Sequence, residues 1–314
     1  MRVTSRLPKS LLATFACALA VAAIFLTGGG ERLEAQEKAA PKKKKIVFVA
    51  GKPSHKPGEH EHRAGCMLLA DHLNKSGLPV EAVVVTNGWP EDKSVFDGAS
   101  AVVIYSDGGG NHPAMKQLVD LRKMAEAGVG IGCIHYAVEV PKGDGGNTFL
   151  DAIGGYFGAD WAGDPHWGAK VKIPTHEGTR GVNEFGTRDE WYYHMRFRQN
   201  MEGVTPILSD LPPAESLSRP DGAHSGNPAV RAAVLERKEP QHVMWTYVRP
   251  EKLGGGRAFG FTGGHFHKNW KLDDQRRVVL NSIVWIAGVE VPEKGVTTAT
   301  PTDEEMAANL DKKG

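Results

Sequence analysis

The stretch Ile46-Val47-Phe48-Val49-Ala50, closed by Gly51, decides the fold class of this chain. It is a continuous apolar run without polar alternation, which is typical of a strand buried on both faces of a parallel sheet. A polar loop follows, and then His62 to Lys75 carry apolar residues at helical spacing. The same order returns further along, with strands expected at 80–86, 101–105 and 129–134 and a helix at 115–127. These repeated units predict an α/β fold with a doubly wound, mostly parallel sheet flanked by helices.

The second half of the chain has a less regular pattern. Strands are expected at 170–173, 191–198 and 230–236, and a short helix at 148–153. The segments 243–248 and 257–262 are joined by a link rich in Pro and Gly, so we expect neighbouring antiparallel strands there. A helix at 273–287 closes the pattern, and residues 289–314 form a polar tail with one weak helix near 304–310. One domain over residues 46–288 is expected, with extra antiparallel strands in its second half.

The first 35 residues have the pattern of a secretory signal peptide. Arg2, Arg6 and Lys9 form a basic start, residues 11–26 are apolar or small, and Leu33-Glu34-Ala35 offers a cleavage site. The apolar run is sixteen residues long, slightly short of the ~20 that a membrane-spanning helix needs, so a retained N-terminal anchor is the alternative. We expect an exported protein, periplasmic or extracellular, in which residues 36–45 form a linker.

The composition excludes several classes of protein. The 314 residues are 40% hydrophobic and 24% charged with 3 cysteines, which is typical of an ordinary globular protein and not of a disulfide-rich or disordered one. The formal net charge is +1, and removing the four basic and two acidic residues of the first 35 changes it to −1. So neutral a chain argues against nucleic acid as a partner. The unexplained feature is its 13 histidines.

Histidines gather in loops that follow predicted strands. These loops carry His55, Glu59, His60, Glu61 and His62 after the first strand, Asp107 and His112 after the third, His135 after the fourth, and His265 and His267 after the strand at 257–262. Because ligands bind at the carboxyl ends of such strands, we expect the loops to converge. Imidazoles with a carboxylate suit Zn²⁺ or a similar divalent transition metal, and the candidate ligands are His60, His62, His135 and His265. A metal-free acid–base site is the alternative; under either hypothesis the catalytic candidates are His135, Glu190 and His265.

Asp189-Glu190-Trp191-Tyr192-Tyr193-His194 is a second dense cluster. Alternate side chains of a strand share a face, so Glu190 and Tyr192 predict one polar wall. Flat apolar faces of the kind that stack on sugars are offered by Trp161, Trp167 and Trp245. The expected substrate-binding residues are Asp107, Asp189, Tyr192 and Trp245. Because the glycines after Asp107 are not followed by the Gly-Lys-Ser/Thr of a P-loop, we expect no nucleotide cofactor.

Cys133 raises the question of a thiol nucleophile, because class I glutamine amidotransferases carry one at the end of a central strand. The sharp turn around such a nucleophile needs small residues two positions before and after it. Ile131 and His135 occupy those positions. We therefore expect Cys133 to face the core and His135 to lie at the sheet edge where the sulfur would be, which argues against amidotransferase or peptidase chemistry.

Four motifs carry a family resemblance: Pro57-Gly58-Glu59-His60, the glycine-rich strand from Gly128 to His135, Asp189-Glu190-Trp191-Tyr192, and Gly255-Gly256-Arg257-Ala258-Phe259 followed by Gly264-His265. Over about residues 45–287 the chain resembles the ThuA-like (trehalose utilisation) family. The resemblance implies a class I glutamine amidotransferase-like, flavodoxin-like fold with its nucleophile replaced. It also implies a role in sugar catabolism, often alongside sugar dehydrogenases that make 3-keto sugars. The chain departs from the family pattern at Cys133-Ile134-His135-Tyr136, where Leu-His-Ala is usual, and in the extra His62.

We therefore expect an exported protein of carbohydrate catabolism that acts on a sugar or 3-keto-glycoside by a hydrolysis, lyase or isomerase step. A sugar dehydrogenase of the same pathway is the expected partner. The alternative is a non-catalytic sugar-binding or scaffold subunit of a periplasmic sugar-oxidation pathway. Thiol hydrolysis through Cys133 is a third hypothesis, which full activity of Cys133→Ala would exclude.

Overall fold

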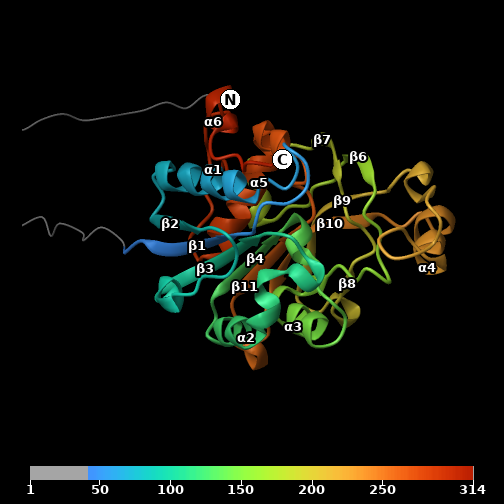
Figure 1. Ribbon diagram of the computed structural model, residues 1–314, viewed down its shortest axis with the longest axis horizontal. Helices are drawn as coiled ribbons and strands as arrows, with labels where there is room; N and C mark the ends of the chain where they lie inside the picture. The colour runs from blue at the N-terminus through green and yellow to red at the C-terminus, as the bar shows by residue number, and fades with distance from the viewer. Residues whose placement is uncertain (1–41, 314) are drawn as a thin grey trace, which may run out of the picture. The chain divides into compact units, whose positions relative to one another are not determined.

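The computed structural model describes residues 42–313, so the expected signal peptide and most of the expected linker lie outside the described residues. Seven strands form the central sheet in the order β2-β1-β3-β4-β11-β10-β9 (Figure 1). Their bounds are β1 Lys44–Ala50, β2 Val80–Val85, β3 Ala99–Tyr105, β4 Gly130–Ile134, β9 Val204–Asp210, β10 Gln241–Val248 and β11 Arg257–Phe261. β1, β2, β3, β4 and β11 pair in parallel, and β10 runs antiparallel to both of its neighbours. The predicted doubly wound, mostly parallel sheet is confirmed.

Helices cover both faces of this sheet. α1 (His62–Lys75) and α5 (Asp273–Ile286) lie on one face, and α2 (Leu118–Glu126) and α3 (Asp144–Ile153) lie on the other (Figure 1). Alternate residues of β1 enter the two cores: Ile46 and Phe48 pack with α1 and α5, while Val47 and Val49 pack with α2 and α3. All four are fully buried, which explains why β1 carries no polar alternation. Within residues 42–313, no helix combines the length and apolar character needed to cross a membrane.

The second half adds the antiparallel elements. β10 pairs with β11 as predicted, and β9 extends the sheet to its edge. Two small ribbons lie outside the main sheet: β5 (Gly155–Tyr156) pairs with β8 (Arg196–Phe197), and β6 (His166–Lys170) pairs with β7 (Gly186–Glu190). In the β6–β7 ribbon His166 lies directly opposite Glu190, which brings both side chains to the same place.

Several expected elements differ from the observed ones. The segment 230–236 is helical: α4 (Pro228–Arg231) continues into a wider turn over Ala232–Glu236. The side chain of Asn227 accepts hydrogen bonds from the first backbone N–H groups, and Pro228 favours a helix start, so capping decides against a strand. The strand expected at 170–173 is β6, which ends at Lys170, and the one expected at 191–198 is reduced to β8. The helix expected at 115–127 begins at Leu118, after a 3₁₀ turn over Pro113–Lys116.

The residues after α5 pack against the domain rather than extending from it. Val291 and Val296 are buried in the core beside α1 and α5. A short helix, α6 (Asp303–Ala307), follows, and the side chain of Thr302 caps its first turn. Residues 42–313 accordingly form one compact unit.

Candidate metal centre

His60 lies in the loop that leaves β1. Its φ of 46° lies in the left-handed region, which is uncommon for a residue with a side chain. Its backbone N–H donates to the carbonyl of His265 at 2.9 Å, so the two loops are tied together. Its ring Nδ1 lies 3.0 Å from Oδ1 of Asp107, the second residue after β3. The ring is 1% exposed and cannot turn freely.

His135 is the first residue after β4, where a φ of 57° makes a sharp turn at the sheet edge. Its Nδ1 donates to the carbonyl of Thr262 at 2.8 Å, and because a carbonyl only accepts, a neutral ring presents a lone pair at Nε2. Cys133, two residues earlier, is fully buried in β4, and burial raises the pKa of its thiol well above the ordinary range. A thiol in such surroundings is a poor nucleophile.

His265 belongs to the loop after β11, and Asp189 holds this loop in place. The Asp189 carboxylate accepts hydrogen bonds from the backbone N–H groups of Gly264 (2.8 Å) and His265 (3.0 Å) and from the side-chain amide of Asn269 (2.9 Å). Gly264 has a φ of 105°, a conformation that favours glycine. Asp189 is fully buried, so it positions the loop and does not reach a substrate.

Three imidazoles and one carboxylate meet at one point. His60 Nε2 is 3.0 Å from His135 Nε2 and 3.0 Å from His265 Nδ1. Glu190 Oε2 is 3.4 Å from His135 Nε2 and 3.2 Å from His265 Nδ1. All four atoms lie within 4.8 Å of one another. Ligand atoms held about 2.0–2.1 Å from a tetrahedral zinc ion are about 3.3 Å apart, so this spacing fits one ion.

The hydrogen-bond partners of the rings indicate what lies between them. Asp107 and the Thr262 carbonyl accept from the Nδ1 atoms of His60 and His135, so both neutral rings direct an unprotonated Nε2 to the same point. The outer Nε2 of His265 is buried and lies 3.7 Å from Glu59 Oε1, too far for a direct hydrogen bond. Lone pairs that face each other repel unless a cation lies between them. The donor set therefore fits a divalent transition metal.

The electrostatics of the group agree with this donor set. Burial, reinforced by the neighbouring histidines, lowers the pKa of His60 far below its ordinary value, so this ring stays neutral. Burial alone would raise the pKa of Glu190, but contacts with His135, His166 and His265 outweigh it and hold that pKa well below the usual range. Neutral imidazole and ionised carboxylate are the forms that bind a metal.

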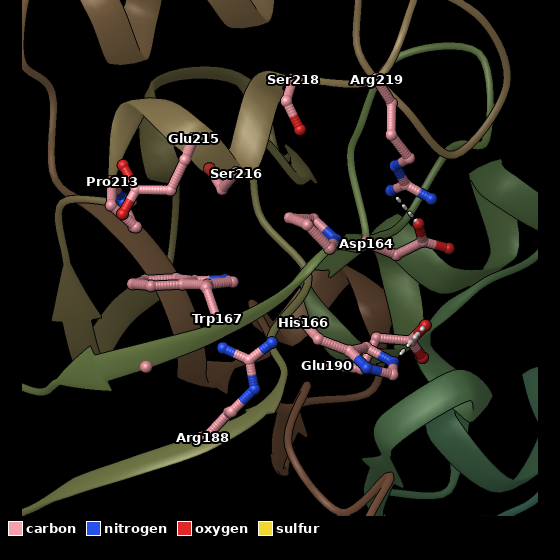
Figure 2. A pocket seen from close by; sticks show the side chains of 12 residues that line it. Asp164, His166, Trp167, Arg188, Glu190, Pro213, Glu215, Ser216, Ser218 and Arg219 are labelled. Carbon is pink, nitrogen blue, oxygen red and sulfur yellow. Dashed lines mark hydrogen bonds and ion pairs between the residues drawn. The ribbon is translucent and has the colours of Figure 1, made fainter.

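A pocket of about 720 Å³ lies beside Glu190 (Figure 2). His166 forms part of its wall, with Nε2 3.4 Å from Glu190 Oε1. Arg188 reaches into the pocket from the same strand as Glu190, and Arg219 lies on the far side, where it pairs with Asp164 at 2.8 Å (Figure 2). The volume lies within the range of about 300–1,000 Å³ that is usual for small-molecule sites. The candidate metal centre thus has a polar pocket next to it.

Two of the predicted site residues, His62 and Asp107, are not among the four converging groups. His62 is fully buried; its Nδ1 lies 3.1 Å from the Lys52 carbonyl, and it is not one of the four converging groups. Burial lowers the pKa of His62 to about 4. Asp107, which is expected to contact substrate, holds the ring of His60, and its side chain is 25% exposed.

The predictions for the aromatic residues have different outcomes. Tyr192 lies against the centre, with its hydroxyl 3.4 Å from Glu190 Oε2. Trp245 is fully buried, and its indole N–H donates to the carbonyl of Ile153 at 2.7 Å. Trp245 therefore cannot contact a substrate, which corrects the expectation. Trp167 is 2% exposed and is one of the residues that line the pocket.

Sequence reasoning missed two residues of the site. His166 was not a candidate, although His166, Gly168 and Lys170 are exposed and Trp167 and Ala169 are buried, an alternation that marks a one-sided strand. Tyr136 is the second of these residues; its ring centroid lies 5.8 Å from that of His60. Its only sequence signal was its position directly after His135.

The sheet order and the converging side chains define a class: an α/β protein with a class I glutamine amidotransferase-like fold, in which a histidine occupies the sharp turn after the central strand. The chain belongs to the ThuA (trehalose utilisation) family, whose model matches residues 46–286. No curated protein matches it.

Two crystal structures have a similar fold. A ThuA-like protein from Bacteroides uniformis is 15% identical with a TM-score of 0.53, and the match covers 81% of this chain and 94% of that one. A ThuA-like protein from Parabacteroides merdae is 17% identical with a TM-score of 0.50, and the match covers 83% of this chain and 94% of that one. At these identities the likeness establishes the fold, while family membership points to a role in trehalose or sugar utilisation.

Proposed function

We propose that this protein is a metal-dependent enzyme of carbohydrate catabolism, acting on a sugar or 3-keto-glycoside by a hydrolysis, lyase or isomerase step. One observation carries the proposal: ring nitrogens of His60, His135 and His265 and the carboxylate of Glu190 converge on one point beside a polar pocket. A divalent metal bound there would polarise a substrate carbonyl or hydroxyl or lower the pKa of a bound water.

The protein's own groups supply the remaining chemistry. His166 is exposed to the pocket, and its contact with Glu190 raises its pKa above the ordinary value despite partial burial. An imidazole in that position can give or take a proton near neutral pH. Arg188 and Arg219 present donors across the pocket, which suits a ligand rich in hydroxyl and carbonyl oxygens.

The metal half of this proposal is tested by direct binding. The purified protein is stripped with a chelator and titrated with Zn²⁺ and with Co²⁺, whose absorption spectrum reports tetrahedral N/O ligation. We expect one ion per chain, with affinity lost in Glu190→Gln, an isosteric change that leaves the volume of the site intact. His242→Gln is the control, because His242 bonds Ser209 away from the centre. A protein that binds neither ion would overturn this half.

The substrate half is tested by turnover. Trehalose, other glycosides and their 3-keto derivatives are incubated with the metal-free and metal-loaded protein, and products are followed by mass spectrometry. We expect metal-dependent turnover of at least one of them. Sugar binding without turnover, unchanged in His60→Ala/His135→Ala, would favour the alternative of a non-catalytic binding or scaffold subunit. Turnover by the metal-free protein would leave a metal-free acid–base site instead.

We also propose that the protein is exported and works alongside a sugar dehydrogenase. The basic start and apolar run of residues 1–35 support export, and the family's role in sugar utilisation supports the pathway. Cell fractionation with N-terminal sequencing tests the first point: a processed protein starting near residue 36 in the periplasm or medium is expected, and an uncleaved cytoplasmic protein would contradict it.

A further inference from the structure

The C-terminal segment from Asp303 to Lys313 contacts the loop after β1, which carries His60, and the loop after β11, which carries His265. We call this segment the C-terminal clasp. From the loop after β11, Nε2 of His267 lies 3.1 Å from the carbonyl of Met306, and Lys271 forms an ion pair with Asp303. From the loop after β1, Glu61 and the backbone carbonyls around it contact Lys313. The clasp therefore joins two loops that are far apart in the sequence.

The ion pair between Lys313 and Glu61 is the core of this contact. Its side chains are 3% and 1% exposed, and Nζ lies 3.3 Å from Oε1. The ammonium also donates to the carbonyls of Glu59 and His60, the latter at 3.2 Å, so all three of its protons have partners. Two charges taken out of water are tolerated only when they are paired and hydrogen-bonded in this way.

Glu61 links the clasp to the rest of the loop. Its Oε1 accepts from the backbone N–H of Gly58 at 2.9 Å, and its Oε2 accepts from that of Asp311 at 3.0 Å. A second tie is made by Arg63, whose guanidinium pairs with Asp311 at 3.1 Å and donates to the Leu310 carbonyl at 2.7 Å. The clasp thus contacts the short turn from Gly58 to Arg63 through several hydrogen bonds and ion pairs.

His60 lies in the middle of this turn in a left-handed conformation, which is strained for a residue with a side chain. The two carbonyls that Lys313 holds belong to His60 and to the residue before it. We propose that Lys313 is a positioning residue, which holds the strained turn of His60 in the conformation that aims Nε2 at the candidate metal. This inference rests on the proposed metal centre, and it adds that the affinity of that centre depends on the C-terminal clasp.

The test compares two adjacent lysines. Lys313→Met removes the buried ammonium, while Lys312→Met changes an exposed side chain of the same type. Zn²⁺ competition titrations are expected to show about 10- to 100-fold weaker binding for Lys313→Met, the range found when groups behind metal ligands are lost, and no change beyond about twofold for Lys312→Met. Because Lys313→Met leaves the Glu61 carboxylate buried without its partner, Lys313→Met/Glu61→Gln is measured as well.

Hydrogen exchange of the metal-free protein separates positioning from general stability and needs no metal. We expect faster exchange of the backbone N–H groups of residues 58–62 in both Lys313 variants, with the protection of β3 and β4 unchanged. Unaltered exchange in residues 58–62, or Zn²⁺ affinity equal to that of the parent protein, would overturn the inference. If the parent binds no metal, the proposed function loses its metal while the exchange result still decides whether Lys313 holds the turn.

Discussion

The Nε2 atoms of His60 and His135 lie 3.0 Å apart, although each ring directs its Nδ1 proton away from the other. Asp107 takes one of these protons and the Thr262 carbonyl takes the other. Two neutral imidazoles so arranged face each other with their lone pairs. The low pKa of His60 keeps that ring unprotonated. A metal ion between the two Nε2 atoms would accept both lone pairs.

Asp107 should control metal affinity without touching the metal. Asp107→Ala removes the acceptor that fixes the His60 ring, and we expect metal binding about 10- to 100-fold weaker in a competition titration. Ser54→Ala is a graded control: its hydroxyl donates to the same carboxylate at 2.8 Å, and its loss should weaken binding less than about tenfold. Equal affinity of Asp107→Ala and the parent protein would show that this contact does not orient the ligand.

Substitution of Asp189 should lower the stability of the fold. Asp189→Asn replaces a fully buried carboxylate that accepts from two backbone N–H groups and one amide, so we expect the free energy of unfolding to fall by about 3 kcal/mol. Urea denaturation of the metal-free protein measures this change. Asp71→Asn, which breaks an exposed pair with Lys75, should lower it by less than about 1 kcal/mol. Similar losses in the two variants would argue against a special role of Asp189.

His112 should make the protein less stable in acid. Burial lowers its folded-state pKa to about 4, against an unfolded value of 6.5, so protonation favours the unfolded chain. The stabilisation is complete above pH 6.5 and is lost as the pH falls toward 4, by about 3 kcal/mol in total. In His112→Asn, the difference in unfolding free energy between pH 7.5 and pH 4.5 should shrink by about 2 to 3 kcal/mol. An unchanged difference would mean that other groups titrate in this window.

Cys66 and Cys133 should not react with a thiol reagent in the native protein, because both are free and buried and burial raises both thiol pKa values. The measurement uses a Cys17→Ser background, since Cys17 lies outside the described residues. Labelling of both thiols should appear only in denaturant. Cys133→Ala should keep its turnover within about twofold; loss of turnover with an intact fold would revive a thiol mechanism.

The sequence sufficed for the parallel strands, for the neighbouring pair β10 and β11, and for the convergence of three histidines, but not for the edge strand β9. Apolar runs such as 46–50 mark strands buried on both faces, and loops after parallel strands share one edge. Trp245 could not be placed in this way: the helix-covered sheet buries both faces of β10, so alternation does not indicate which side chains reach a pocket.

His166 and Lys313 show what local patterns leave out. His166 reaches the centre only because β6 pairs in register with β7, and no pattern within β6 specifies that partner. Lys313 lies in a stretch that is polar by composition, and its burial depends on Glu61, which is 252 positions earlier in the numbering. Both depend on tertiary contacts that short-range periodicity does not encode.

The clasp also determines the stage of folding at which the four converging groups can come together. Lys313 follows His60 by 253 positions, and His265 follows it by 205, so the first ligand loop must wait for contacts from almost the whole length of the domain. Such distant contacts form late because closing a long chain segment costs entropy before any contact forms. Under the proposed function, a nascent chain therefore lacks the geometry that holds the ion, and metal binding is expected to follow folding rather than to start it.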